Sequence, residues 1–202
     1  MRWKELASKI EVCALCDDMN IPHETKSAPG WGSVRSPVAI VGQSLCEPCM
    51  ESKEPFDGGC GIFLGRSLDA VGIDKCDLFI TNVVHCHPRD NCKSRAQEKK
   101  NCRPYLLGEL EIVQPRLVIG LGGDAEVALR SAYPEGRVLS WPFKKHRPIP
   151  KAASSPDLLF APHPGRIRWL RKDIRDRYVT QWVASLASAL EWGFRDRPNA
   201  AL

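Results

Sequence analysis

The sequence contains neither a long hydrophobic run nor a hydrophobic leader at its amino terminus. None of its apolar segments approaches the roughly 20 residues that cross a lipid bilayer. Residues 1–5 do not lead into the apolar stretch of a secretory signal. Internal repeats and low-complexity linkers are absent as well. These absences argue against a membrane-bound, secreted or repetitive protein, and they predict a cytoplasmic one.

The composition is that of a folded, mildly basic domain. Apolar residues make up 43% of the 202 residues and charged residues 26%, which argues against general disorder. Lysine and arginine (29) exceed aspartate and glutamate (24), an excess that permits nucleic-acid binding without requiring it. Basic residues are concentrated between positions 144 and 172, where Asp157 is the one acidic residue. Such a segment suits a nucleic-acid contact and a solvated surface equally well.

Four short apolar runs rich in β-branched residues predict the fold class. They span residues 38–41, 78–81, 117–121 and 158–161, and continuous runs of this length are typical of strands buried on both faces. Segments with helical spacing separate them, and a further helical stripe covers 173–192. We therefore expect one domain over residues 1–202, an α/β/α sandwich with a central four-stranded parallel sheet. A basic, proline-rich insertion loop is expected near 134–156.

Unusual peptides follow each predicted strand. They are Gly42-Gln43-Ser44, Asn82, Gly122-Gly123 and His163-Pro164-Gly165. Open α/β sheets bind ligands at the carboxyl ends of their strands. We therefore expect the four peptides to converge on one cleft.

Nine cysteines in a chain without a secretion signal indicate metal binding more readily than disulfides. Cys13-x2-Cys16 places two thiols on one turn, and Cys86 and Cys102 follow the second predicted strand. Two such pairs can close a four-thiolate site for zinc or for an iron–sulfur cluster. Buried cysteines without a ligand remain the alternative. The other cysteines include a second C-x-x-C without a partner pair, Cys46 and Cys49, and Cys92, which could replace Cys86 as a ligand.

Several motifs together resemble family 4 uracil-DNA glycosylases. The segments that carry the resemblance are 80–88 (ITNVVHCHP), 102–106 (CRPYL), 55–61 (PFDGGCG) and 163–165 (HPG). Their order and spacing extend from Cys13 to about Arg168. The resemblance implies a uracil-DNA glycosylase-like fold and a DNA repair enzyme. Such an enzyme hydrolyses the N-glycosidic bond of uracil in DNA and leaves an abasic site.

The resemblance also implies a cofactor and a partner. A structural [4Fe–4S] cluster, in preference to zinc, is expected at Cys13, Cys16, Cys86 and Cys102. The expected partner is DNA that contains uracil or another deaminated base, bound by a monomer at the nucleoid of a prokaryotic cell. No membrane partner is expected.

The implied uracil pocket contains Phe56, Asn82 and His163. Phe56 would stack on a base flipped out of the duplex. The Asn82 amide can donate to uracil O4 and accept from N3–H, a pattern that rejects cytosine. His163 would donate to O2 as negative charge develops there, and a neutral imidazole suffices for this. Gly42, Ser44 and Cys49 are expected to line the same pocket.

The loop after His163 is expected to enter the minor groove of DNA. Ile167 would fill the gap that the flipped base leaves, while Arg166 and Arg168 hold phosphates. Lys144 and Lys145 of the basic insertion are further candidates for DNA contact.

The first motif departs from the family pattern. Gln43 stands where the family has glutamate and cannot act as a general base, so it would only position the attacking water. Ser44 stands where family 1 enzymes, which also begin this motif with Gly-Gln, have aspartate. Cys49 and Met50 replace acidic residues near the base, and Gly165 replaces serine in the last motif.

These departures leave other functions open. One alternative is a glycosylase for hypoxanthine or xanthine. Another is a protein that binds lesions or abasic sites with little turnover, with His85, His87 or His146 as the nucleophile of a covalent adduct. A third is a four-cysteine zinc protein with no role on DNA.

Overall fold

The computed structural model describes residues 2–145 and 155–195. A six-stranded sheet runs through the centre in the order β1-β3-β2-β4-β6-β5. β1 pairs antiparallel with β3, and the remaining pairs are parallel. The strands are β1 (Trp31–Gly32), β2 (Val38–Ser44), β3 (Phe79–Val84), β4 (Leu117–Leu121), β5 (Val138–Leu139) and β6 (Asp157–Ala161).

The four predicted strands are the four central strands β3, β2, β4 and β6. All five residues of β4 are buried, as are the first five of β2, because helices cover both faces of the sheet. The expected α/β sandwich is thus confirmed. The sheet is wider than expected, since the two-residue strands β1 and β5 extend its edges.

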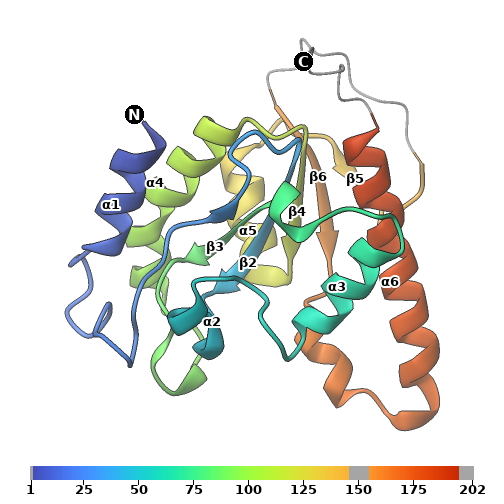
Figure 1. The fold of residues 1–202 in the computed structure, drawn as a ribbon, viewed down its shortest axis with the longest axis horizontal. Helices are drawn as coiled ribbons and strands as arrows, with labels where there is room; N and C mark the ends of the chain where they lie inside the picture. The colour runs from blue at the N-terminus through green and yellow to red at the C-terminus, as the bar shows by residue number, and fades with distance from the viewer. Residues whose placement is uncertain (1, 146–154, 196–202) are drawn as a thin grey trace.

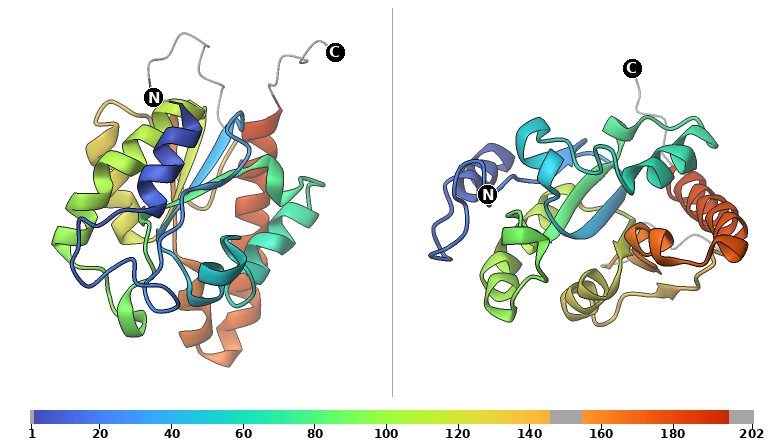
Figure 2. Two further views of the ribbon diagram at one scale, coloured as in Figure 1. Left: turned by 60° about the vertical axis from the view of Figure 1, so that its left-hand side comes forward. Right: turned by 90° about the horizontal axis from the view of Figure 1, so that it is seen from below.

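Helices cover the two faces of the sheet as separate layers (Figures 1 and 2). On one face α6 packs Trp182, Leu186 and Leu190 into a core shared with α3. On the other face α4 and α5 form the second core, and α1 lies beside α4. The helices are α1 (Trp3–Glu11), α2 (Glu47–Ser52), α3 (Gly61–Asp69), α4 (Ala96–Val113), α5 (Gly123–Ala132) and α6 (Lys172–Phe194).

The expected insertion near 134–156 is only partly a loop. It contains β5, which pairs with β6 through Val138 and Leu139. Phe143 then packs into the core and donates its backbone N–H to Ser185 Oγ of α6 at 2.7 Å. Residues 146–154, which include the candidate nucleophile His146, lie outside the described residues.

None of the helices in the described ranges is long and apolar enough to cross a membrane.

Candidate functional site

A cleft of about 950 Å³ lies at the carboxyl ends of β2, β3 and β6. In Figure 1, α2 and the turn before α6 lie below the arrowheads of β2 and β6. The peptides that follow β2, β3 and β6 meet in this cleft, whereas Gly122-Gly123 after β4 does not line it. The predicted site residues that line it are Gly42, Gln43, Ser44, Cys49, Phe56, Asn82, His163, Arg166, Ile167 and Arg168.

One corner of the cleft brings an aromatic ring and an amide together around Gly42. Gly42 lies opposite Asn82 in the register of β2 and β3. A Cβ atom at position 42 would lie 2.4 Å from Asn82 Oδ1 and 3.7 Å from Phe56 Cζ. Glycine therefore leaves the space that both side chains occupy. The Asn82 amide forms no hydrogen bond to the residues that the structure describes, so it is available to a ligand.

Phe56 is held in an unusual backbone conformation. Its φ of 56° lies in the left-handed region, which a bulky residue rarely adopts. The ring is half-buried and packs against the core on the α3 side of the sheet. Strained residues of this kind persist where the surrounding structure holds them, often at ligand sites.

His163 begins the 3-10 turn that follows β6. Its Nδ1 accepts the backbone N–H of Gly165 at 3.0 Å, so the proton of the neutral ring is on Nε2. Burial lowers the pKa of His163 below its ordinary value, which keeps the imidazole neutral at pH 7. Gly122, with a φ of 91°, packs against the His163 Cβ from behind. The site therefore presents a neutral N–H donor.

The turn after His163 (Pro164–Trp169) carries the predicted DNA-binding residues. Arg166 and Arg168 are exposed. Ile167 is not available to DNA, because its side chain is 1% exposed and belongs to the core. The hypothesis that Ile167 wedges into the duplex is therefore wrong for this conformation. Trp169, which the sequence analysis did not single out, lines the cleft and is 77% exposed.

Two residues of α6 hold this turn in place. Arg175 donates to the backbone oxygens of Arg168 and Leu170 at 3.1 and 2.8 Å. Trp182 Nε1 donates to the Pro162 oxygen at 2.9 Å. Arg175 follows the turn closely in the chain, whereas Trp182 is 20 residues from Pro162, and the helical pattern alone gives no sign that either residue supports the turn.

The remaining predicted site residues differ in their surroundings. Gln43 and Ser44 are half-buried at the end of β2, and their side chains make no hydrogen bond to another described residue. Lys144 and Lys145 are exposed but do not line the cleft.

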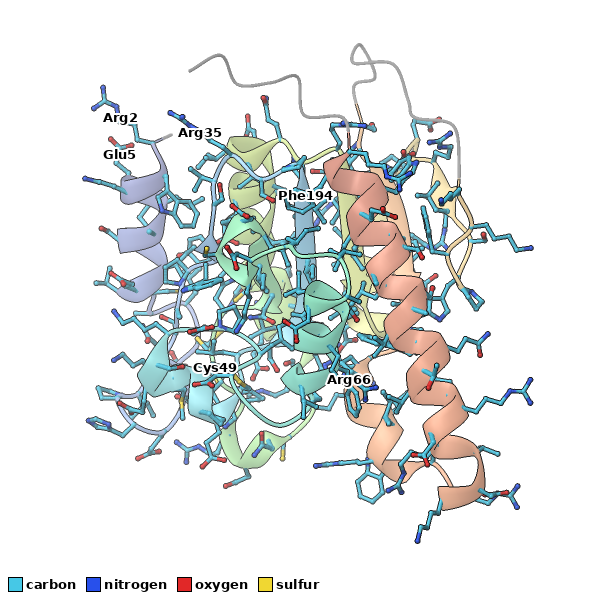
Figure 3. The ribbon with its side chains drawn as sticks, turned by 45° about the vertical axis from the view of Figure 1, so that its right-hand side comes forward. Arg2, Glu5, Arg35, Cys49, Arg66 and Phe194 are labelled. Atoms are coloured by element: carbon cyan, nitrogen blue, oxygen red, sulfur yellow. A yellow bond between two sulfur atoms is a disulfide. The ribbon has the colours of Figure 1, made fainter. Side chains whose placement is uncertain are left out.

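Cys46 and Cys49 form a disulfide in the cleft wall, which the sequence analysis did not predict. Cys49 is buried, and Figure 3 shows it on α2. This part of the cleft wall therefore carries a neutral, bridged sulfur. Cys60, to which the sequence analysis gave no role, and Cys92, the alternative to Cys86 as a ligand, also line the cleft.

Cys13, Cys16, Cys86 and Cys102 lie near one another away from the cleft. All four are free thiols. Burial raises the pKa of Cys86 to about 12, and the neighbouring sulfurs of Cys102, Cys13 and Cys16 add to the rise. Within residues 2–145 and 155–195, no three His, Cys, Asp or Glu side chains converge on the position of a metal ion. The four cysteines are thus close together as free thiols, but their side chains do not point at one common centre.

Two buried histidines that the sequence analysis considered as nucleophiles are already engaged. His85 Nε2 lies 3.1 Å from Glu109 Oε2, and both side chains are buried. Burial opposes the charge on His85, but Glu109 and the Cys102 sulfur outweigh it and raise the pKa of His85 to about 10. His87 Nδ1 lies 2.9 Å from the Leu45 oxygen. Neither histidine lines the cleft.

Residues 29–187 match the model of the uracil DNA glycosylase superfamily. This match covers the sheet and every cleft residue described above. The chain belongs to this superfamily.

Curated relatives within the superfamily carry two kinds of name. The type-4 uracil-DNA glycosylase of Pyrobaculum aerophilum is 36% identical over 113 residues, which are 55% of this chain and 58% of that protein. The type-4 uracil-DNA glycosylase of Archaeoglobus fulgidus is 31% identical over 120 residues, 58% of each chain. The type-5 uracil-DNA glycosylase of Mycobacterium bovis is 30% identical over 152 residues, 66% of this chain and 55% of that protein. The chain thus spans somewhat more than half the length of each relative.

The four neighbouring cysteines are those at which the resemblance to family 4 uracil-DNA glycosylases implies a metal group, and all four are free thiols. Burial, and after it the neighbouring sulfurs of Cys102 and Cys13, raise the pKa of both Cys16 and Cys86. Four thiolates at one place therefore require a cation, and both zinc and iron–sulfur clusters take four cysteine ligands.

Proposed function

We propose that this chain is a DNA glycosylase that flips uracil out of DNA and hydrolyses its N-glycosidic bond, leaving an abasic site. One observation carries the proposal. The unpaired amide of Asn82 and the ring of Phe56 meet around Gly42, in the same cleft as the neutral imidazole of His163. A stacking surface, an amide and a neutral donor are the groups that a flipped uracil needs.

Recognition would take place at the Gly42 corner. Phe56 stacks on the base, and the Asn82 amide donates to O4 while it accepts from N3–H. Cytosine reverses both groups and would leave the amide without partners, which costs far more than the loss of an apolar contact.

His163 would stabilise the departing base. Its Nε2–H donates to uracil O2, where negative charge grows as the bond to the sugar breaks. The Gly165 N–H occupies Nδ1 and so keeps the donor proton on the other nitrogen.

Water attack would follow bond breaking in this mechanism. Neither Gln43 nor Ser44 can take a proton at neutral pH, so no strong base at the end of β2 activates the water. The sugar cation is reactive enough to need little activation. The unpaired Gln43 amide would position the water.

Trp169 is the residue that we propose as the duplex wedge, in place of the buried Ile167. It is the aromatic residue of the turn and is 77% exposed. The Cζ atom of Arg168 lies 4.9 Å from the centroid of its ring. Exposed aromatic rings stack on bases, while the arginines beside them pair with phosphates.

We further propose that Cys13, Cys16, Cys86 and Cys102 hold a [4Fe–4S] cluster. When bound, the cluster would serve as a structural link between the amino-terminal segment and the loop after β3. A zinc-loaded protein would lack the visible absorption of such a cluster.

Strand scission tests the proposed reaction. Purified protein is incubated with matched oligonucleotides that contain uracil, hypoxanthine, xanthine or thymine, and alkali then cleaves abasic sites. We expect scission at uracil, and a loss of about 10²-fold or more in His163→Ala and Asn82→Ala. His23→Ala is the control, because His23 is an exposed histidine that does not line the cleft and pairs only with the exposed Glu51 among the described residues.

The neutral wall at Cys49 favours one alternative in the same assay. Scission only at hypoxanthine or xanthine would show that one of these bases, and not uracil, is the substrate. Tight binding to abasic DNA with no scission at any base would contradict catalysis.

A further inference from the structure

Two of the four clustered cysteines are more accessible than the others. Cys86 and Cys102 are buried, whereas Cys13 and Cys16 are only half-buried on the segment after α1. The exposed side chains of Val12 and Leu15 lie beside them in the chain. A cluster held here would therefore be approached by solvent and oxidants from the side of the first pair.

Asn101 of α4 reaches this accessible pair with its amide. Its Nδ2 donates to Cys16 Sγ at 3.2 Å and to the Leu15 oxygen at 2.7 Å. Its Oδ1 accepts from Gln97 Nε2 at 2.8 Å. Because the Leu15 oxygen can only accept and Gln97 Nε2 can only donate, the nitrogen of the Asn101 amide faces the sulfur and its oxygen faces Gln97.

Tyr105 lies one helical turn further along the same face of α4. Residues four apart on a helix are neighbours on its surface, so Asn101 and Tyr105 face the same segment. Burial, and after it a hydrogen bond with the Cys13 sulfur, raise the pKa of the Tyr105 hydroxyl to about 12. Its ring stands edge-on to His85, with centroids 6.0 Å apart, and His85 is itself held by Glu109.

We propose that Asn101 and Tyr105 are positioning residues for the iron–sulfur ligands. The amide N–H of Asn101 donates to Cys16 and the hydroxyl of Tyr105 donates to Cys13, one donor for each accessible sulfur. Donors of this kind orient metal ligands, and hydrogen bonds to the sulfurs help to set the reduction potential of a cluster. Because they stabilise the added negative charge of the reduced state, they raise that potential.

The inference rests on the cofactor that is part of the proposed function. It adds that α4 protects the exposed edge of the cluster site through two specific donors. Removing either donor therefore has two consequences: a more negative midpoint potential and faster loss of the cluster.

The test uses the full chain, reconstituted with iron and sulfide without air. Asn101→Leu removes the amide with little change in volume, and Tyr105→Phe removes only the hydroxyl. Gln181→Ala is the control, because Gln181 is an exposed neutral amide on α6, on the other face of the sheet. The midpoint potential is measured by reductive titration of the visible absorption, and cluster loss by the decay of that absorption with an iron chelator.

We expect a more negative midpoint and a several-fold faster decay in both variants, with Gln181→Ala like the wild type. Unchanged midpoints and decay rates in the loaded fraction of Tyr105→Phe and Asn101→Leu would overturn the inference. If Asn101→Leu does not fold, Tyr105→Phe alone decides. A wild-type protein that takes up zinc and no cluster would overturn the inference and the cofactor assignment together, while uracil excision is scored separately on oligonucleotides.

Discussion

Ile167 and Trp169 are two positions apart on one 3-10 turn, yet the first is buried and the second is 77% exposed. With three residues per turn, positions i and i+2 point in different directions. Arg175 holds the backbone on both sides of Trp169, through the oxygens of Arg168 and Leu170. Together with Trp182, it helps to set which side chains the turn exposes.

Trp169→Ala is expected to slow uracil excision from double-stranded DNA more than from single-stranded DNA. A wedge matters only where a base must be replaced in the stack, and base–aromatic stacking contributes about 1–3 kcal/mol. Trp169→Phe should retain part of the rate. Single-turnover excision on both substrates measures this, and equal losses on the two would contradict the wedge role.

The stability of the protein should depend on pH through His163. Burial lowers its folded pKa below 6.5, so the unfolded chain takes up the proton first as the pH falls. The stability carried by the neutral ring is present above 6.5 and is lost as the pH drops below that value. Urea unfolding above and below pH 6.5 should show this loss in the wild type and not in His163→Gln. An NMR titration of the ring with a midpoint at or above 6.5 would contradict it.

The sequence is informative about some of these residues and silent about others. Gly42, Asn82 and His163 could be predicted to meet because parallel strands place their carboxyl ends at one edge of a sheet. The orientation of Ile167 could not, because an apolar residue beside two arginines suits a wedge and a core position equally. The bond between Cys46 and Cys49 was missed because a C-x-x-C in a chain without a secretion signal suggests a metal.

At the scale of secondary structure, some strands could be predicted from the sequence and others could not. The central strands were predictable because burial on both faces leaves continuous apolar runs such as Leu117–Leu121. β1 and β5 have two residues each, which is too short for any period to appear in the sequence. The support that α6 gives to the turn after β6 depends on bonds from the side chains of Arg175 and Trp182 to backbone oxygens, and such bonds leave no periodic pattern in the sequence.

Arg175→Ala is expected to loosen that support. The variant loses two hydrogen bonds to backbone oxygens, each worth about 1 kcal/mol, and the turn that carries Arg168 and Trp169 becomes less ordered. We expect weaker binding to uracil-containing DNA together with a lower melting temperature. Arg177→Ala, one of the exposed residues of α6, is the control. If the Arg175→Ala protein binds DNA like the control, the turn keeps its conformation without the hydrogen bonds of Arg175, and the prediction is wrong.

On the scale of the whole molecule, the predicted DNA-binding residues fall into two separate groups. Arg166 and Arg168 line the cleft, whereas Lys144 and Lys145 follow the edge strand β5 and do not line it. DNA that enters the cleft must meet the arginines, and it meets the lysines only if it extends to that edge.

The salt dependence of DNA binding distinguishes the two groups. Each phosphate contact adds about 0.9 to the slope of log affinity against log salt concentration. Replacing Arg166 and Arg168 by alanine should reduce the slope by nearly two such contacts. Replacing Lys144 and Lys145 should reduce it less. Equal reductions would place the lysine loop on DNA as fully as the cleft rim.

The four clustered cysteines also have a consequence for how the protein is made. Cys13 and Cys16 leave the ribosome first, but Cys102 follows only with α4, after β2 and β3 have been synthesised. The site can thus be completed only once half of the sheet exists. If the four cysteines hold the proposed cluster, it can be loaded only after α4 has been made, and a chain that is not loaded lacks the link between its amino-terminal segment and the loop after β3.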